Sequence, residues 1–339
     1  MHEVKEKRWH PLFQEWVIIS ETTSQRPWSG EVVSVKLEEA PTYDAQCYLC
    51  PGNVRAKGDK NPDYQLPFSI FNDFPSIAFG SFEVDNEHVP PFSMAVPAGG
   101  ICKVLIYHRN HRFTLAHFSD SEFLEVINLW QNEYETLSQN SALANILIFE
   151  NKGKVIGVSN LHPHGQLYAT DFVPPKIATI AASFTATFEN EGKYLLQEIL
   201  KFEINEQSRI VLENEHWVVM VPYFAQYSYE TWIVPKRFFQ HIGHLLPNEK
   251  QSLAQIYLAI LNKYDRLFGF SLPNITTLYN APLQDGKKFK VTHFQFFIRF
   301  TPPLRDAEKL KYLAGFETGG GNIINPLAPE NAARILREC

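Results

Sequence analysis

The sequence lacks the features that mark several classes of protein. Its 339 residues include only four cysteines, too few for the disulfide framework that stabilises small secreted domains. Lysine and arginine number 31 against 37 acidic residues, and a net charge of −6 does not favour binding to nucleic acid. No apolar run is long enough to span a bilayer, and the charged beginning "MHEVKEKRWHPLF" lacks the apolar stretch of a signal peptide. We therefore expect a cytoplasmic protein that binds neither nucleic acid nor membranes.

The composition, 45% hydrophobic and 20% charged residues, is that of a globular protein, and the chain is long enough to form a sizeable core. Residues 119–137 carry apolar side chains at helical spacing, which predicts an amphipathic helix. Residues 247–267 repeat the same spacing 130 positions later, so that Phe123 aligns with Leu253. Any amphipathic helix resembles another, so the helices alone do not establish a duplication.

Strand-like segments repeat as well, rich in β-branched and aromatic residues and each with a polar end. They are "NILIFEN" and "NITTLYN" at 145–151 and 274–280, and "KVLIYHRNH" and "TWIVPKRFF" at 103–111 and 231–239.

The histidine segments complete the repeat. With a shift of 129, His164 aligns with His293 and Gln166 with Gln295. Offsets of 128 to 130 that recur across strand, helix, strand and histidine segment are hard to obtain by chance. We predict an α+β fold of two tandem units, each an antiparallel sheet with a helix packed on it.

The division predicted from this repeat falls between residues 1–170 and 171–339. The first unit keeps the full His-Pro-His-Gly-Gln run, whereas the second has Val291 at the position aligned with His162. We expect the first unit to be catalytic and to carry a metal site, and the second to support it and contribute to substrate binding.

The run "GVSNLHPHGQLYA" places His162 and His164 on either side of Pro163. In a strand, residues two apart face the same side, so both rings are expected to point into one site. The proline restricts the backbone of its neighbour and of itself, which stiffens that placement. Gly165 is expected to leave room for a ligand beside His164, and Gln166 to supply an amide donor.

Three interpretations of this histidine pair are metal binding, a buried structural pair and nucleophilic catalysis. A neutral imidazole is nucleophilic near pH 7 without a separate base, and bonded to phosphorus it is also a good leaving group. We therefore interpret His164 as the nucleophile of a group transfer at phosphorus, with Gln166 as its supporting donor.

Cys47 and Cys50, in "CYLCPGN", have the spacing of zinc ligands. A redox-active pair and two unligated core cysteines are the alternatives. A tetrahedral site needs two further ligands, and His111 and His162 are available.

Several segments together identify a family resemblance: "CYLCPGNVRAKGDKNPDY", "FNDF", "FENKGKVIGVSNLHPHGQLYA", "EHWVVMVPY" and "RFTPPLRDAEKLKYLAGFE". From about Trp9 to Glu317 the chain resembles the galactose-1-phosphate uridylyltransferases of the histidine-triad superfamily. The resemblance implies two histidine-triad-like units in one chain. It also implies a ping-pong exchange of UMP between UDP-glucose and galactose 1-phosphate, in which a uridylyl group is held on His164.

The resemblance also assigns roles to residues. It implies one structural zinc per chain on Cys47, Cys50, His111 and His162, the four that spacing made available. It further implies a homodimer with shared active sites, in which Lys311 and Glu317 reach the sugar phosphate from the partner subunit. The implied substrate residues are Asn72, Asp73 and Phe74 for uridine, and Arg26, Asn151, Ser159 and Gln166 for the phosphates.

The sequence departs from the family in places. Thr23 replaces one phosphate-binding arginine and leaves Arg26. Phe297 and Arg299 stand where some relatives have iron ligands, and Ile180 replaces a ligating glutamate, so we expect no iron site. Two other functions remain open: a related transferase or phosphorylase acting on another nucleotide sugar such as ADP-glucose, and a non-catalytic, zinc-stabilised nucleotide-binding protein.

Overall fold

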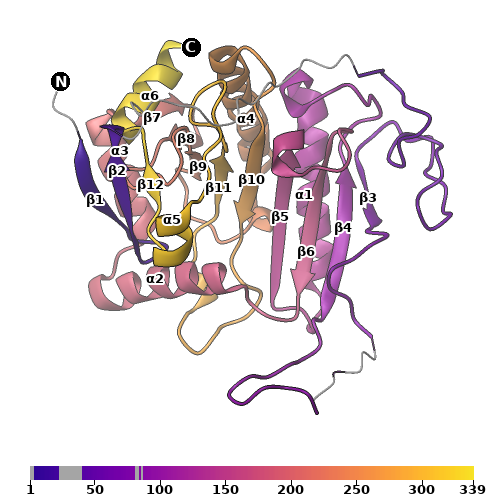
Figure 1. The fold of residues 1–339 in the computed structure, drawn as a ribbon, viewed down its shortest axis with the longest axis horizontal. Coiled ribbons are helices and arrows are strands. Elements are labelled where there is room, and N and C mark those ends of the chain that lie inside the picture. Colours follow the sequence, from indigo (N-terminus) through magenta and orange to yellow (C-terminus); the bar gives the residue numbers. More distant parts are fainter. Residues whose placement is uncertain (1–3, 23–39, 81–83, 85–86) are drawn as a thin grey trace.

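The computed structural model describes residues 4–22, 40–80, 84 and 87–339 (Figure 1). Within these residues a nine-stranded antiparallel sheet crosses the molecule. Its strands, in spatial order, are β3 (Phe68–Phe71), β4 (Gly100–Ile106), β6 (His164–Thr170), β5 (Asn145–Lys152), β10 (Asn274–Tyr279), β11 (Phe297–Thr301), β9 (Thr231–Pro235), β8 (Trp217–Met220) and β7 (Ile210–Glu213).

A smaller sheet lies beside β7 and β8 in the view of Figure 1. In it β2 (Glu15–Ser20) pairs with β1 (Lys5–His10) in antiparallel fashion and with β12 (Ile324–Asn325) in parallel fashion. The short helix α5 (Gly315–Gly320) precedes β12. Among the described residues, single 3₁₀ turns lie at Leu115–His117, Lys154–Ile156, Ile242–His244 and Val291–His293.

The helices cover the two faces of the large sheet unequally. Side chains of α1 (Asp120–Ser138), α4 (Pro247–Phe268) and α6 (Pro329–Glu338) share one core cluster on one face. Side chains of α2 (Pro175–Glu191) and α3 (Leu195–Glu206) form a second cluster with the other face of β7, β8, β9 and β11. The predicted mixed α+β fold with an antiparallel sheet is therefore confirmed.

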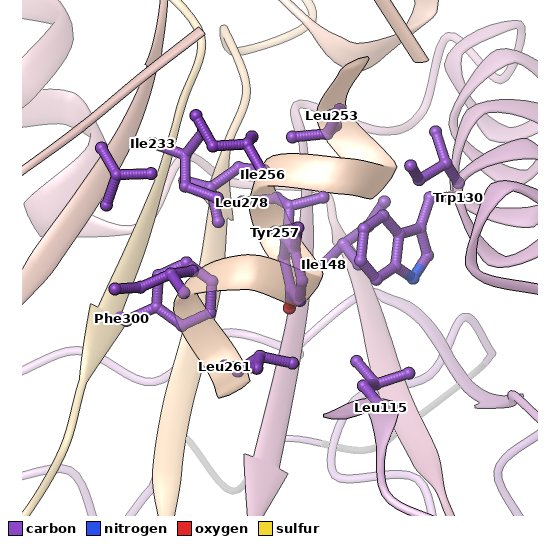
Figure 2. Packing of buried hydrophobic residues seen from close by; sticks show 14 of the residues in the cluster. Leu115, Trp130, Ile148, Ile233, Leu253, Ile256, Tyr257, Leu261, Leu278 and Phe300 are labelled. Carbon is purple, nitrogen blue, oxygen red and sulfur yellow. The ribbon is translucent and has the colours of Figure 1, made fainter. Parts of the chain in front are cut away.

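The first of these cores explains why the apolar spacing of the two long helices repeats. Trp130 of α1 and Tyr257 of α4 meet above Ile148 of β5 and Leu278 of β10, and all four are buried (Figure 2). The amide of Glu122 donates to the Ser119 hydroxyl, so that α1 begins with a capping box. Among the described residues, no helix is both long enough and apolar enough to cross a membrane.

The repeat is visible in the order of the strands. The first copy contributes β4, β6 and β5 with α1, and the second contributes β9, β11 and β10 with α4. β5 pairs directly with β10, so the two copies share one continuous sheet and one core.

The strand register corrects the alignment of the two histidine segments. Leu167 pairs with Ile148 in the first copy, and Ile298 pairs with Leu278 in the second. All four side chains belong to the same core cluster. When these two pairs are superimposed, each residue of β5 corresponds to the residue of β10 that is 130 positions later (278 − 148). Each residue of β6 corresponds to the residue of β11 that is 131 positions later (298 − 167), and neither offset is the predicted 129.

With this register, Gln295 corresponds to His164 and His293 corresponds to His162. The predicted alignment of His164 with His293 is therefore wrong, and so is that of Val291 with His162. A slip of two residues leaves the inward and outward faces of a strand unchanged, so the sequence pattern could not detect it.

Candidate active site and metal centre

His164 is the first residue of β6 and is half-buried. Its Nδ1 lies 2.6 Å from the carbonyl oxygen of His162. A carbonyl only accepts hydrogen bonds, so we assign the ring proton to Nδ1, which leaves the lone pair of Nε2 free. Burial lowers the pKa of His164, although its bond to the His162 carbonyl raises it. The ring is therefore neutral near pH 7 and able to act as a nucleophile.

The path of the chain changes the argument made for His162. β6 begins at His164, and His162 lies in a bend before it rather than in the strand. The prediction that both rings face one site as alternate strand residues is wrong for His162. Its ring is almost completely buried in the metal centre described below, while its carbonyl holds the proton of His164.

Gly165 has a different role from the one expected. A Cβ at this position would lie 1.9 Å from the hydroxyl oxygen of Tyr107 and 3.1 Å from the carbonyl oxygen of Phe149. Tyr107 in turn accepts a hydrogen bond from Trp130 Nε1 at 3.1 Å in the core. Because Gly165 faces the helices, its missing side chain admits the buried tyrosine, and the predicted space for a ligand is not there.

Gln166 and Asn151 lie on the same face of the sheet as His164. Gln166 is two residues along β6 and pairs with Phe149 of β5. Asn151 is two residues beyond Phe149, so its side chain leaves the same face. Ser159 is exposed in the segment before His162, with its hydroxyl 3.3 Å from that of Tyr48. The structure thus brings Gln166 and Asn151 to the face that carries His164.

The segment expected to bind uridine follows the edge strand β3. Asn72 accepts a hydrogen bond on its side chain from the Phe74 amide at 2.9 Å, which fixes a tight turn. Phe74 is 75% exposed and free to stack on a planar ring. Asp73 lies 3.5 Å from Nη1 of Arg55, a neighbour that the sequence did not indicate.

The four predicted metal ligands converge. The ligand atoms of Cys47, Cys50, His111 and His162 all lie within 4.8 Å of one another, and all four residues are buried. Cys50 Sγ lies 3.6 Å from His111 Nδ1 and 3.5 Å from His162 Nδ1. Around a tetrahedral zinc with ordinary bond lengths, a sulfur and a nitrogen ligand stand about 3.6 Å apart. The geometry therefore fits such an ion.

The protonation states of these side chains also suit a metal. Burial lowers the pKa of His162 to about 3, and it lowers the pKa of His111, so both rings are neutral. Burial raises the pKa of Cys50 to about 12, so a bound cation is needed to hold it as a thiolate. Four protein ligands fill a tetrahedral shell and leave no position for substrate.

Asn160 is a neighbour of the metal centre that no sequence pattern indicated. Its Nδ2 donates to Cys47 Sγ at 3.3 Å, and its Oδ1 accepts from the His162 amide at 2.9 Å. It thereby links a cysteine ligand of the centre to a histidine ligand. An asparagine two residues before a histidine carries no recognisable signal on its own, so only the fold identifies this role.

The remaining predicted residues lie away from His164 or outside the residues that the structure describes. Lys311 Nζ donates to Glu317 Oε1 at 2.7 Å and to the Ile324 carbonyl at 2.6 Å, and both side chains are largely buried. Figure 1 shows α5, which contains Glu317, on the side of the molecule with β2 and β12, whereas β6 lies in the other half. Arg26 and Thr23 fall outside the described residues.

The face that carries His164 in the first copy is closed in the second. Phe297 corresponds to Gln166 and is fully buried, with its ring stacked on those of Trp232 and Tyr279. Beside it, Arg299 makes two hydrogen bonds to the buried Glu230, at 2.7 and 2.9 Å. A guanidinium paired in this way cannot ligate a metal. The expectation that no iron is bound stays a prediction.

Comparisons with known proteins cover nearly the whole chain. Residues 1–174 match the family "Galactose-1-phosphate uridyl transferase, N-terminal domain", and residues 181–339 match its C-terminal domain. The galactose-1-phosphate uridylyltransferase of Haemophilus influenzae is 35% identical over 98% of this chain and 93% of its own. That of Rattus norvegicus is 36% identical over 97% and 86%.

Solved structures agree in fold. An ADP-glucose phosphorylase from Arabidopsis thaliana with bound ADP-glucose superimposes with a TM-score of 0.78, covering 99% of both chains at 23% identity. A uridylyltransferase structure gives the same TM-score at 24% identity, covering 92% of this chain and 96% of its own. At these identities the likeness supports the fold alone.

Proposed function

The chain belongs to the galactose-1-phosphate uridyl transferase family, and we propose that it exchanges UMP between UDP-glucose and galactose 1-phosphate. The observation that carries the proposal is the position of the ring proton on His164. Its Nδ1 proton is held by a backbone carbonyl, which leaves the lone pair on Nε2 of the half-buried ring. This is the form of imidazole that attacks phosphorus.

The reaction proceeds in two displacements at the α-phosphorus. Nε2 of His164 attacks the α-phosphorus of UDP-glucose, the bond from phosphorus to the bridging oxygen breaks, and glucose 1-phosphate leaves with the electron pair. A phosphate oxygen of galactose 1-phosphate then attacks the uridylyl-histidine, which releases UDP-galactose and restores the neutral ring. Throughout, the His162 carbonyl is positioned to stabilise the proton, and the partial positive charge, on Nδ1.

Neighbouring side chains are assigned to binding. We assign Gln166, Asn151, Ser159 and Arg26 to the phosphates, and Asn72, Asp73 and Phe74 to uridine. Gln166 and Asn151 share the sheet face of His164, which supports their part in this assignment. A preorganised amide donor to a phosphoryl oxygen contributes roughly 10²–10³ in rate.

The metal centre is proposed to hold one structural zinc. Two thiols and two neutral imidazoles at tetrahedral spacing support zinc over harder cations, which prefer oxygen ligands. When bound, the ion neutralises the two thiolates and fixes the segment before His164. No catalytic step is assigned to it.

We propose that the enzyme works in the cytoplasm as a homodimer, in which Lys311 and Glu317 serve the partner's active site. Figure 1 supports this because the chain's own α5 lies in the other half of the molecule from β6. The division at residues 1–170 and 171–339 is retained as a description of the two repeats.

The test uses nucleotide sugars labelled with ³²P at the α-phosphate. Purified enzyme incubated with UDP-glucose should retain one acid-labile, base-stable label per site, and galactose 1-phosphate should discharge it as UDP-galactose. His164→Gly should take up no label. Labelling by ADP-glucose in preference to UDP-glucose would replace this function with the alternative nucleotidyltransferase, and absence of any label would replace it with nucleotide binding alone.

A further inference from the structure

Tyr64 connects the segment that carries the two cysteine ligands with the histidine ligand His162. Its hydroxyl oxygen lies 2.7 Å from the carbonyl oxygen of Leu49 and 2.9 Å from Nε2 of His162. Leu49 lies between the two cysteine ligands, whereas His162 comes from the segment before β6, 98 residues from Tyr64 in sequence. Tyr64 itself is 7% exposed, so water does not compete for these contacts.

The direction of the two hydrogen bonds follows from the number of protons. The Leu49 carbonyl can only accept, so the single hydroxyl proton of Tyr64 is directed to it. Toward His162 the phenol oxygen must then accept, and the proton in that contact belongs to Nε2 of the ring. A neutral imidazole with its proton on Nε2 presents the lone pair of Nδ1, and Nδ1 is the atom that lies 3.5 Å from Cys50 Sγ.

We propose that Tyr64 is the positioning residue that selects the metal-binding tautomer of His162 and couples it to the cysteine pair. The inference rests on the proposed zinc site and adds to it a determinant outside the four ligands. Partners of this kind raise metal affinity by fixing the orientation and tautomer of a histidine ligand. Removing the hydroxyl leaves a buried N–H and a buried carbonyl without their partner.

The coupling extends to the nucleophile. His162 binds Tyr64 through its ring and His164 through its carbonyl. A change in the orientation of His162 therefore displaces the acceptor that holds the Nδ1 proton of His164. Tyr64 acts on the reaction only through this residue.

The first experiment measures zinc affinity by competition with a chromophoric chelator. Tyr64→Phe keeps the ring and removes the hydroxyl, and should weaken zinc binding by roughly 10–100-fold. Tyr43→Phe is the matched control, because this half-exposed phenol binds the Asn53 side chain in the same segment without contacting a ligand. Its zinc affinity should stay within about twofold of the parent, given ordinary surface effects.

The second experiment needs no variant. In ¹¹³Cd-loaded, ¹⁵N-labelled enzyme, the histidine whose Nε2 proton shows a nuclear Overhauser effect to the Tyr64 ring should couple to cadmium through Nδ1. Coordination of that ring through Nε2 would overturn the proposal.

The outcomes separate the two hypotheses. Tight zinc binding by the parent and equal binding by Tyr64→Phe would overturn the role of Tyr64 and leave the zinc site intact. Failure of the parent enzyme to bind zinc or cadmium would overturn both. A 10–100-fold loss confined to Tyr64→Phe, together with coordination through Nδ1, would establish the role.

Discussion

Glu150 offers the most quantitative test of how this fold treats a buried charge. It lies in β5 on the side that faces the helices and is 8% exposed. Burial raises its pKa to about 7, an effect that Lys152 partly opposes. The same carboxyl contributes to the raised pKa values of Tyr107 and Tyr257, after their own burial. The perturbation to make is Glu150→Gln, which keeps the shape and removes the ionisation.

The sign follows from comparing the folded and unfolded chains. Unfolded, this carboxyl ionises near its reference pKa of 4.5, whereas folded it keeps its proton to about pH 7. Between these values the unfolded chain binds fewer protons, so the free energy of unfolding falls as pH rises. The rise of the Glu150 pKa from 4.5 to about 7 corresponds to roughly 3 kcal/mol of stability. The parent therefore loses up to this amount between about pH 4.5 and a little above pH 7.

Urea unfolding followed by tryptophan fluorescence measures the effect at pH 5 and pH 8. At pH 5 Glu150→Gln and the parent should be similarly stable, and at pH 8 the variant should have gained about 2–3 kcal/mol relative to the parent. Glu189→Gln, at an exposed position on α2, is the control and should show no such change. A parent-to-variant difference that is the same at both pH values would refute the reasoning, because Glu150 would then not keep its proton on folding.

Four further outcomes are expected. His164→Gly should lose the exchange by many orders of magnitude, because the covalent route is gone; residual turnover with adduct formation would contradict this. Cys50→Ser should lower zinc content and melting temperature, and retention of a full equivalent of zinc by metal analysis would count against the site. Gly165→Ala should cost about 1–3 kcal/mol in urea unfolding by overpacking, and adding Tyr107→Phe should recover part of that loss; no recovery would show that the hydroxyl is not the obstacle. Mixed dimers of His164→Gly and Lys311→Ala should regain activity in one shared site, and subunit exchange without activity would place Lys311 in its own chain's chemistry.

Local patterns in the sequence determined much of the site. The spacing of Cys47 and Cys50 and the run around His164 specified which chemistry to expect, because those choices depend on residue type at short separations. The helical periods of 119–137 and 247–267 predicted α1 and α4 for the same reason. The periodicity of apolar residues shows which face of an element is buried, and it can be recognised within a single segment of the sequence.

Some conclusions needed the pairing of strands. The correspondence of His164 with Gln295 rests on which residues of β5 and β10 lie opposite β6 and β11. For β6 and β11 the predicted shift of 129 and the observed shift of 131 differ by two residues and keep the same faces inward, so the hydrophobic pattern could not choose between them. In the second copy Phe297 takes the position of Gln166 and packs in one core cluster with side chains of α2. The sequence could not predict that this face is covered, because it does not show which helix packs on which face of the sheet.

Contacts between distant segments were decided by the tertiary structure alone. Gly165 reads in sequence as room for a ligand, yet the hydroxyl of Tyr107 fills that space. Tyr64 and Asn160 have no pattern that marks them, because their partners Leu49, His162 and Cys47 reach them only through folding. A sequence specifies which side chains are present and which face of an element they share. Which buried hydrogen-bond donor meets which acceptor depends on packing between elements, where a shift of about 1 Å makes or breaks the contact.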